Sequence, residues 1–303
     1  MASTGAALTA SYDAKDVILY ALSLGFGSDP QTYDEELPFC YERKGKLVVL
    51  PTFAATLSFR ARTPTDAPRS LPPFPPPIMK ELLPRPSLRN PALSLAEYPV
   101  LHMWTRLEWY RTMPCPSVDS IVAVNLQSEF LSVVPKSVGT FVTTKTKMML
   151  ANTQPLCSMQ ATSLLLGLDP DEVNPLLLES PTARPSIPSR EPDHVTEYSV
   201  TTNQALLYRL ASGDTNSIHV QSDDGILLHG LCTLGMAARA ILAYTKNPDF
   251  ASMEGRFTKP VRLGDRLRFE LWNEQSTVRF RVRRGNTTVL DNGCVVLRNM
   301  SRL

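Results

Sequence analysis

Polar and apolar residues alternate at a period of two over residues 266–271 and 278–283, where most of the polar positions are arginines. Such alternation is typical of strands with one buried face, so the two stretches predict a hairpin joined around 273–276. A further strand is expected over 287–297, interrupted by the Asp-Asn-Gly turn signal at 291–293. The alternating arginines favour solubilising charge on the exposed face over a role in holding anionic ligand groups.

Helical periodicity marks three other stretches. Apolar positions recur at helical spacing over 14–24 and, more briefly, over 202–210, while 226–244 forms the longest expected helix. The small residues of that helix would let a sheet approach it closely. Strand-like runs are expected at 46–50, 120–126, 138–149 and 161–166. A long helix followed by an antiparallel sheet with one apolar face predicts an α+β layer in which the sheet curls around the helix.

Most prolines cluster in two segments of the chain. Of the 26 prolines, eleven lie between Pro64 and Pro99 and six between Pro170 and Pro192. Proline fixes φ and removes a backbone donor, so neither segment suits a helix or a central strand. The second segment separates two patterned halves and indicates an interdomain linker. The first favours a loop covering the core of the N-terminal half over a proline-rich ligand for a partner's aromatic groove.

Composition narrows the class of protein. The 303 residues are 43% hydrophobic and 20% charged, with a formal net charge of +2, which fits a globular protein of one or two domains. So small a net charge argues against a nucleic-acid partner. The five widely spaced cysteines suggest neither a disulfide framework nor a zinc site, so a reducing compartment is expected. The sequence shows no secretory signal and no apolar run long enough to span a membrane.

The most informative chemistry lies between residues 214 and 230. Asp214, Asn216 and His219 follow a predicted helix, where a carboxylate and an imidazole close together can divide acid and base work on one water molecule. The amide of Gly230 would be an unsatisfied donor at the start of a helix and would suit a developing oxyanion. The alternative is that the turn is only capped by side chains and that His219 is structural. No spacing typical of a metal site accompanies these residues, so no metal is expected.

Three motifs in order give the sequence a family resemblance. The runs Tyr208–His219, Leu228–Gly235 and Arg256–Val261, the last followed by Gly264-Asp265, resemble those of the MaoC-like, R-specific enoyl-CoA hydratases, also called hydratase 2. The N-terminal half resembles the non-catalytic first repeat of the two-repeat eukaryotic members at residues 12–25, 51–54, 101–114 and 154–167. The resemblance thus covers nearly the whole chain.

The resemblance implies a double hot-dog fold of two antiparallel sheets, each wrapped around a central helix. It implies a degenerate repeat at 1–168 that shapes an acyl pocket, a linker at 169–193 and a catalytic repeat at 194–303. By position, Asp214 and His219 match the catalytic pair, Asn216 the residue that orients them, and Gly230 the oxyanion-hole amide. His229 and Lys259 are further substrate-binding candidates.

The implied reaction is reversible syn addition of water to trans-2-enoyl-CoA, which gives the (3R)-3-hydroxyacyl-CoA. Coenzyme A enters as part of the substrate, so no other cofactor is expected. The two halves would pair as an internal pseudo-dimer, and a true homodimer stays an open alternative.

Two departures from the family pattern affect the site. Ser217, a further substrate-binding candidate, stands where the family has proline, and about eight residues are missing between His219 and Ile226. The shorter connection is expected to open the acyl pocket or to displace His219. Asp223 and Asp224 then either line the pocket mouth or cap the following helix. These departures motivate two alternatives to an enoyl-CoA hydratase. The first is a tailoring dehydratase that acts on a specialised, polyketide-like thioester, and the second is an inactive protein that binds acyl thioesters.

The chain ends in Ser301-Arg302-Leu303, a variant of the Ser-Lys-Leu peroxisomal address. This tripeptide predicts recognition by the peroxisomal import receptor. Because peroxisomes carry out enoyl-CoA chemistry, the tail and the motifs together predict a peroxisomal enzyme of acyl-CoA metabolism.

Overall fold

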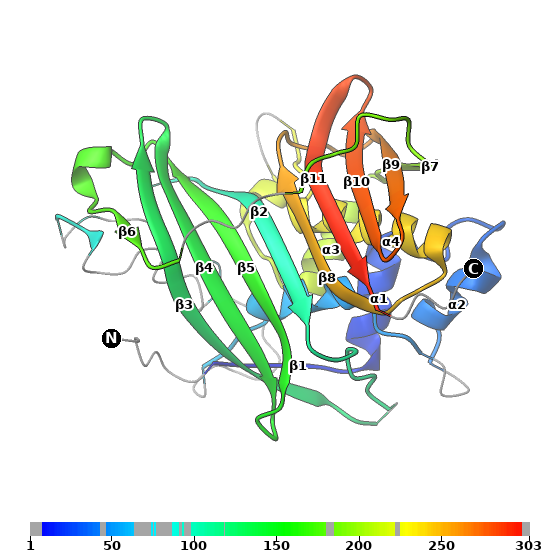
Figure 1. Cartoon of the computed structure of the whole chain (residues 1–303). Coiled ribbons are helices and arrows are strands. Elements are labelled where there is room, and N and C mark those ends of the chain that lie inside the picture. Colours follow the sequence, from blue (N-terminus) through cyan, green and yellow to red (C-terminus); the bar gives the residue numbers. More distant parts are fainter. Residues whose placement is uncertain are drawn as a thin grey trace.

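The computed structural model describes residues 8–42, 47–63, 74, 76, 87–90, 93, 98–117, 119–179, 185–221 and 225–298. Within these ranges, eleven strands form one curved antiparallel sheet in the order β1-β3-β4-β5-β2-β8-β11-β10-β9-β7, and β6 pairs with β3. Helices pack in the concave side of this sheet (Figure 1).

The N-terminal part contains three long strands that follow one another through short connections. Its elements are β1 (Leu8–Tyr12), α1 (Ala14–Ser23), α2 (Tyr33–Cys40), the 3₁₀ helix η2 (Pro51–Ser58), β2 (Val100–Trp109), β3 (Val122–Lys136), β4 (Gly139–Leu150) and β5 (Pro155–Leu166). The 3₁₀ helix η6 (Pro170–Glu172) and the short β6 (Leu176–Leu177) follow. Every residue of η2 is buried, so this short helix fills the place of a central helix in the N-terminal half.

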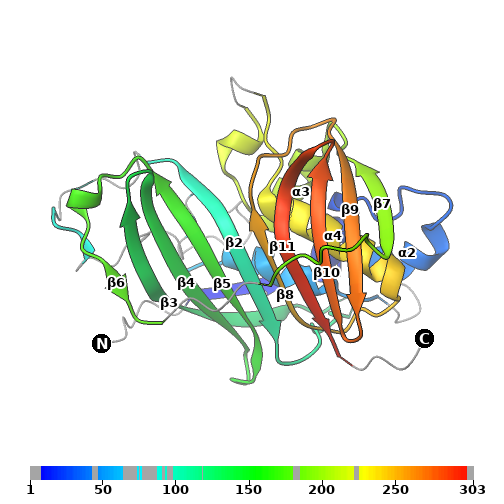
Figure 2. The ribbon, with the colours of Figure 1, turned by 45° about the horizontal axis from the view of Figure 1, so that its top comes forward.

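The C-terminal part wraps around one long helix. Its elements are β7 (His194–Ser199), α3 (Gln204–Ser212), the 3₁₀ helix η7 (Ser217–His219), α4 (Gly230–Thr245), β8 (Phe250–Phe257), β9 (Arg266–Glu274), β10 (Thr277–Arg284) and β11 (Thr287–Leu297). Helix α4 is almost wholly buried, because small residues such as Gly235 and Ala238 let its neighbours approach. A Cβ at Gly235 would lie 2.6 Å from the side chain of Leu24. Figure 2 shows α3 and α4 behind the strands of this half.

The two parts of the sheet meet where β2 pairs with β8, from Trp104 opposite Arg256 to Glu108 opposite Ser252. Arg106 donates to Glu254 across this joint at 2.7 Å. The α+β class and the double hot-dog fold are therefore confirmed, with the two expected sheets joined edge to edge. The boundaries at 168/169 and 193/194 stay a prediction.

Three local expectations need correction. Residues 47–50 form no strand, because Leu47, Val49 and Leu50 are buried in the core ahead of η2 rather than paired in the sheet. Helix α4 begins at Gly230 and not at 226, since the backbone of Leu228 bonds to Val261 and holds the preceding residues extended. The strand over 287–297 is continuous, and its register against β8 shifts between Asp291 and Cys294.

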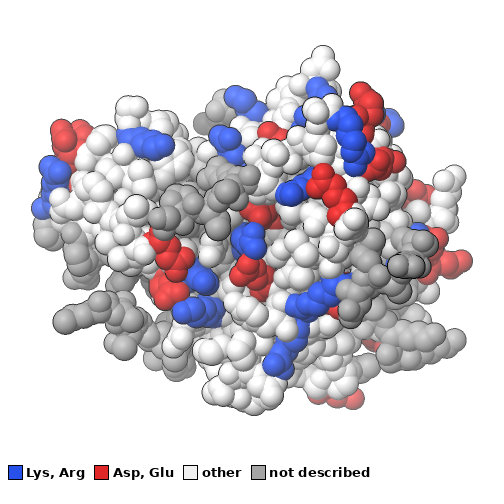
Figure 3. Space-filling view, in the orientation of Figure 1, with Lys and Arg blue, Asp and Glu red and all other residues white. Residues whose placement is uncertain are grey.

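The charged residues of the sheet are largely paired with one another. Glu270 is 5% exposed and lies within ion-pairing distance of Arg268, Arg281 and Arg283, at 3.2, 2.7 and 3.8 Å. Figure 3 shows basic and acidic groups interspersed over one face of the molecule. This pairing favours the interpretation of the alternating arginines as solubilising charge. Among the described helices, none combines the length and the apolar character that a membrane span requires.

Candidate active site

Asp214 is placed by the end of helix α3. Gly213 closes this helix in the left-handed conformation, with φ at 76°, which favours glycine. The chain then turns, and the backbone amide of Asp214 donates to Oγ of Ser212 at 3.1 Å. The carboxylate accepts from the backbone amide of Asn216 at 3.1 Å. These bonds hold the Asp214 side chain, which is 8% exposed, in one orientation.

His219 lies on the short helix η7, which Asn216 caps by accepting from the amide of Ile218 at 3.3 Å. Nδ1 of His219 is 2.8 Å from the carbonyl oxygen of Leu227. Because a carbonyl only accepts, Nδ1 carries the proton and Nε2 of the neutral ring is an acceptor. The ring nitrogen left for chemistry is therefore Nε2.

His229 stacks on His219. The ring centroids are 3.6 Å apart and the planes differ by 23°. His229 is 2% exposed, and neither of its ring nitrogens makes a hydrogen bond within the part of the chain that is described. The ring of Tyr208 packs on it as well, with centroids 4.9 Å apart. His229 therefore restricts the position of His219.

Burial shifts the proton affinity of all three groups. It raises the pKa of Asp214 and lowers the pKa of His219, while the opposite charge of each partner partly offsets the shift in the other. Burial, together with His219, lowers the pKa of His229 well below its usual range. Bringing the proton affinities of a carboxylate and an imidazole closer together suits a pair that exchanges protons with substrate.

Gly230 is the first residue of α4, so its amide has no carbonyl in a preceding turn to bond with. The ring of Phe257 packs directly on it, and a Cβ at this position would lie 3.1 Å from Cδ1 of that ring. A side chain at this position would force the ring or the amide to shift by a few tenths of an ångström. The Gly230 amide lies at the positive end of a 16-residue helix, where it suits an oxyanion.

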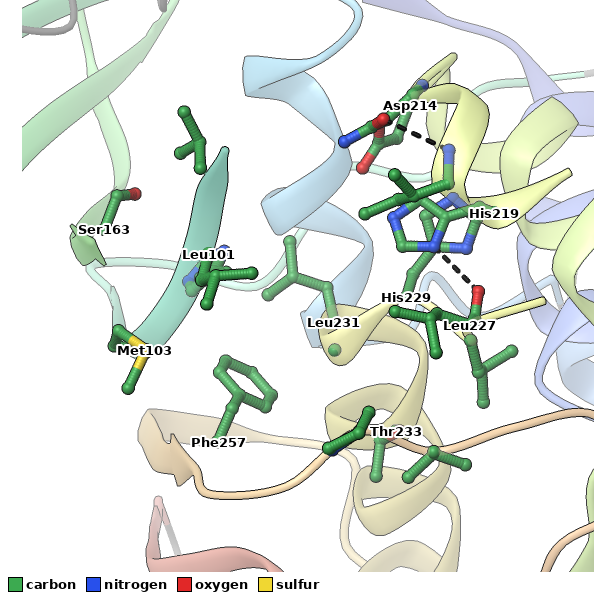
Figure 4. Close-up of a pocket in the computed structure, with 18 of the residues that line it drawn as sticks. Leu101, Met103, Ser163, Asp214, His219, Leu227, His229, Leu231, Thr233 and Phe257 are labelled. Atoms are coloured by element: carbon green, nitrogen blue, oxygen red, sulfur yellow. Dashed lines mark hydrogen bonds between the residues drawn. The ribbon is translucent and has the colours of Figure 1, made fainter. Parts of the chain in front are cut away.

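These residues line a cavity of about 390 Å³. Its wall is mainly apolar and comes from both halves of the chain, namely Phe59, Phe74, Val100, Leu101, His102, Met103, Ser163, Asp214, Asn216, Ile218, His219, Leu227, Leu228, His229, Gly230, Leu231, Thr233, Phe257, Thr258, Lys259, Pro260, Val261 and Val289. Figure 4 shows Asp214 and His219 on one side and Leu101, Met103 and Ser163 on the other, with Leu231 and Phe257 between. The size and lining suit a small apolar ligand with a polar head.

Asp214, His219 and His229 form a cluster whose metal-ligating atoms lie within 4.8 Å of one another. A metal bound by imidazoles requires lone pairs that converge at about 2.0–2.1 Å. The stacked rings of His219 and His229 instead run nearly parallel, so their lone pairs do not meet. The arrangement does not fit a metal centre, and the expected absence of a metal stays a prediction.

Comparison with known proteins agrees with this geometry. Residues 184–293 match the family model of the MaoC like domain, and residues 10–80 match the MFE-2 hydratase 2 N-terminal domain. The chain is 29% identical to the peroxisomal enoyl-CoA hydratase 2 of Arabidopsis thaliana, over 96% of this chain and 92% of that protein. A crystal structure of a MaoC-like dehydratase from Phytophthora capsici superposes with a TM-score of 0.77 at 26% identity, covering 98% of this chain and 96% of the other.

The chain therefore combines a MaoC-like domain with a hydratase 2 N-terminal domain. It is also 28% identical to the peroxisomal multifunctional enzyme type 2 of Drosophila melanogaster, over 94% of this chain and 44% of the relative. The chain thus spans less than half the length of that enzyme and nearly the whole of the Arabidopsis hydratase.

The structure brings most of the predicted site residues together, but not all of them. It brings Asp214, Asn216, His219, His229 and Gly230 together in the cavity wall. Lys259 also lines the cavity but is exposed at its rim. Ser217, in contrast, is exposed and does not line the cavity.

Two groups of predicted residues lie outside the described part of the chain. These are Asp223 and Asp224 in the shortened connection, and the tail residues Ser301, Arg302 and Leu303.

The sequence did not single out the opposite wall of the cavity. Leu101, His102 and Met103 on β2 and Ser163 on β5 supply it from the N-terminal half. In the sequence, Leu101-His102 stands out only as part of the family resemblance. The feature of the sequence that could have indicated this wall is His102, a histidine in an otherwise apolar strand segment.

Proposed function

We propose that this chain adds water to the C2–C3 double bond of 2-enoyl thioesters and catalyses the reverse dehydration. The observation that carries the proposal is the placing of Asp214, His219 and the Gly230 amide in one cavity wall. Two proton-exchanging groups and one oxyanion donor are what this reaction needs. The family assignment supports the same chemistry.

The proton balance follows from the geometry. In hydration, the Asp214 and His219 pair removes a proton from water as oxygen bonds to C3. The electrons of the double bond shift toward the thioester carbonyl, whose oxygen becomes enolate-like beside the Gly230 amide. The pair then returns a proton to C2, so no net proton is consumed. Asp214 and His219 both line the cavity, and Nε2 is the His219 nitrogen left to exchange these protons with the substrate.

The substrate we propose is a trans-2-enoyl-CoA, which gives the (3R)-3-hydroxyacyl-CoA by syn addition. The mainly apolar cavity suits the acyl chain, and the exposed Lys259 at its rim suits a phosphate of coenzyme A. Coenzyme A is part of the substrate, and the proposed mechanism uses no other cofactor and no metal.

We place the reaction in the peroxisome. Relatives from Drosophila melanogaster and Arabidopsis thaliana are named peroxisomal, and the tail Ser301-Arg302-Leu303 is a variant of the address read by the import receptor. Loss of peroxisomal import on deleting this tripeptide would support the placement. Unchanged import would contradict it.

The hydratase proposal is tested by adding crotonyl-CoA and longer trans-2-enoyl-CoA esters to the purified chain and following the loss of ultraviolet absorbance. Asp214→Asn and His219→Ala are each expected to lower kcat by at least about a hundredfold. Chiral analysis of the product tests the (3R) assignment. Tight binding of the esters with no turnover at any chain length would refute hydratase activity and favour an acyl-thioester binding protein.

One feature favours a second candidate, a tailoring dehydratase for a bulkier thioester. Only six residues connect His219 to Ile226, and Leu227 forms a bridge with Arg262 directly after them. A short connection at this point covers less of the cavity than the longer segment of the family pattern. Efficient turnover of simple straight-chain enoyl-CoA esters would count against this candidate.

A further inference from the structure

The cavity wall opposite the catalytic pair carries two polar groups, His102 and Ser163. They lie directly opposite each other in the ladder between β2 and β5, and both line the cavity. Residues facing each other across an antiparallel pair point to the same side of the sheet, with Cβ atoms ~5 Å apart. The two side chains are therefore close enough to contact one ligand atom together.

The hydrogen-bonding state of His102 is fixed by its backbone contact. Nε2 is 3.2 Å from the carbonyl oxygen of Trp104, so Nε2 carries a proton and donates it. Burial lowers the pKa of His102 to about 4, so the ring is neutral near pH 7. The second nitrogen, Nδ1, is then a hydrogen-bond acceptor only.

Neither Nδ1 of His102 nor Oγ of Ser163 has a hydrogen-bond partner among the described residues. Neither atom is sealed inside the protein without a partner, as the ring nitrogens of His229 are. Both therefore face the cavity as free polar groups. Their surroundings are apolar, with Leu101 and Met103 on the same strand and the ring of Phe257 against His102 at 5.1 Å.

A bulge in β2 follows directly on this pair of residues. The register against β5 shifts between His102 and Trp104, so Met103 has no partner in the ladder. Consecutive strand residues normally face opposite sides, but here Leu101, His102 and Met103 all line the cavity. The bulge thus adds Met103 to the cavity lining, while His102 keeps the regular register opposite Ser163.

We propose that His102 and Ser163 form a subsite for a hydroxyl group carried on the acyl chain, away from the thioester end. The hydroxyl would donate to Nδ1 of His102 and accept from Oγ of Ser163. A carboxylate fits poorly, because the neutral ring offers it no donor at Nδ1 and no positive charge. This subsite rests on the proposed function, in which Asp214 and His219 hold the reacting carbons on the other side of the cavity (Figure 4).

The test compares trans-2-decenoyl-CoA with its 6-, 8- and 10-hydroxy and 10-carboxy counterparts. We expect kcat/KM for at least one hydroxylated ester to exceed that of the parent by about tenfold, the value of one good hydrogen bond. Ser163→Ala and His102→Phe should each bring this ratio close to one. Ser128→Ala, on β3 and outside the cavity lining, is the matched control and should keep the wild-type ratio.

The ratio of two substrates on one variant cancels any loss of folded protein, so a merely structural role would not change it. The subsite is refuted if no hydroxylated ester is preferred, if the carboxylated ester is preferred, or if Ser163→Ala keeps the preference. Calorimetric binding of saturated decanoyl-CoA and its hydroxylated forms gives the same comparison without turnover. Failure of the hydratase proposal would therefore leave this test intact.

Discussion

The buried ion pair between Glu36 on α2 and Arg239 on α4 offers a sharp test of what holds the two halves together. Nε and Nη2 of Arg239 donate to the two carboxylate oxygens of Glu36 at 2.6 and 3.1 Å. Glu36 is 7% exposed and Arg239 is 4% exposed. The guanidinium also lies over the ring of Tyr198, 4.5 Å from its centroid. In Glu36→Gln the arginine charge stays buried with no opposite charge beside it.

Breaking a buried pair from one side costs about 3–5 kcal/mol, because the remaining charge is left uncompensated. The unfolding entropy of globular proteins is about 2.1 cal/mol/K per residue, or about 0.6 kcal/mol/K for this chain, so Tm should fall by about 5–8 °C. Calorimetry and urea unfolding of Glu36→Gln measure both quantities.

The neighbouring Glu35 supplies the matched control. It pairs with Lys246, but the two side chains are 60% and 56% exposed, and exposed pairs contribute at most about 1 kcal/mol. Glu35→Gln removes the same charge from the same helix. Equal losses of stability in the two variants would refute the argument from burial.

Two further predictions concern the site. Gly230→Ala should lower kcat at least about tenfold, because the added Cβ meets the Phe257 ring at 3.1 Å and displaces the amide. Steady-state kinetics of Gly230→Ala measures this loss, and the double variant with Phe257→Leu should recover part of the activity. No rescue would mean that the ring contact is not the cause. Acid should destabilise the fold through His102, whose pKa is about 4 in the folded state and about 6.5 when unfolded. Below pH 6.5 the unfolded chain binds the extra proton, so stability falls by up to about 1.4 kcal/mol per pH unit until pH 4. His102→Phe should show a shallower loss in urea unfolding between pH 7 and pH 4, and an unchanged slope would refute the assignment.

Much of the fold followed from periodicity. The hairpin of β9 and β10 and the helices α1 and α3 were predicted closely because each has one buried face and one exposed face. The strands β2 and β8 were missed, since residues such as Arg106 and Glu254 break the apolar pattern. These charges pair across the joint at 2.7 Å, and a single strand's sequence does not reveal its partner.

The site residues also differ in how far the sequence could predict them. Asp214, His219 and Gly230 lie within 17 residues of one another and could be found from local spacing and a family resemblance. The stack of His229 on His219 could not be found in that way, because it depends on the extended segment that positions the start of α4. The extended residues ahead of α4 place His229 and Gly230 in the cavity wall.

The opposite wall depends on how the two halves join. Strand β2 lines the cavity with Leu101, His102 and Met103, and from the next residue on it pairs with β8 through Trp104–Glu108. The bulge at Met103 lies between these two parts of the strand, so the cavity-lining residues end where the pairing with β8 begins. The cavity is thus a property of the joined sheet. Neither half alone would provide both a proton-exchanging pair and a surface that selects the acyl chain.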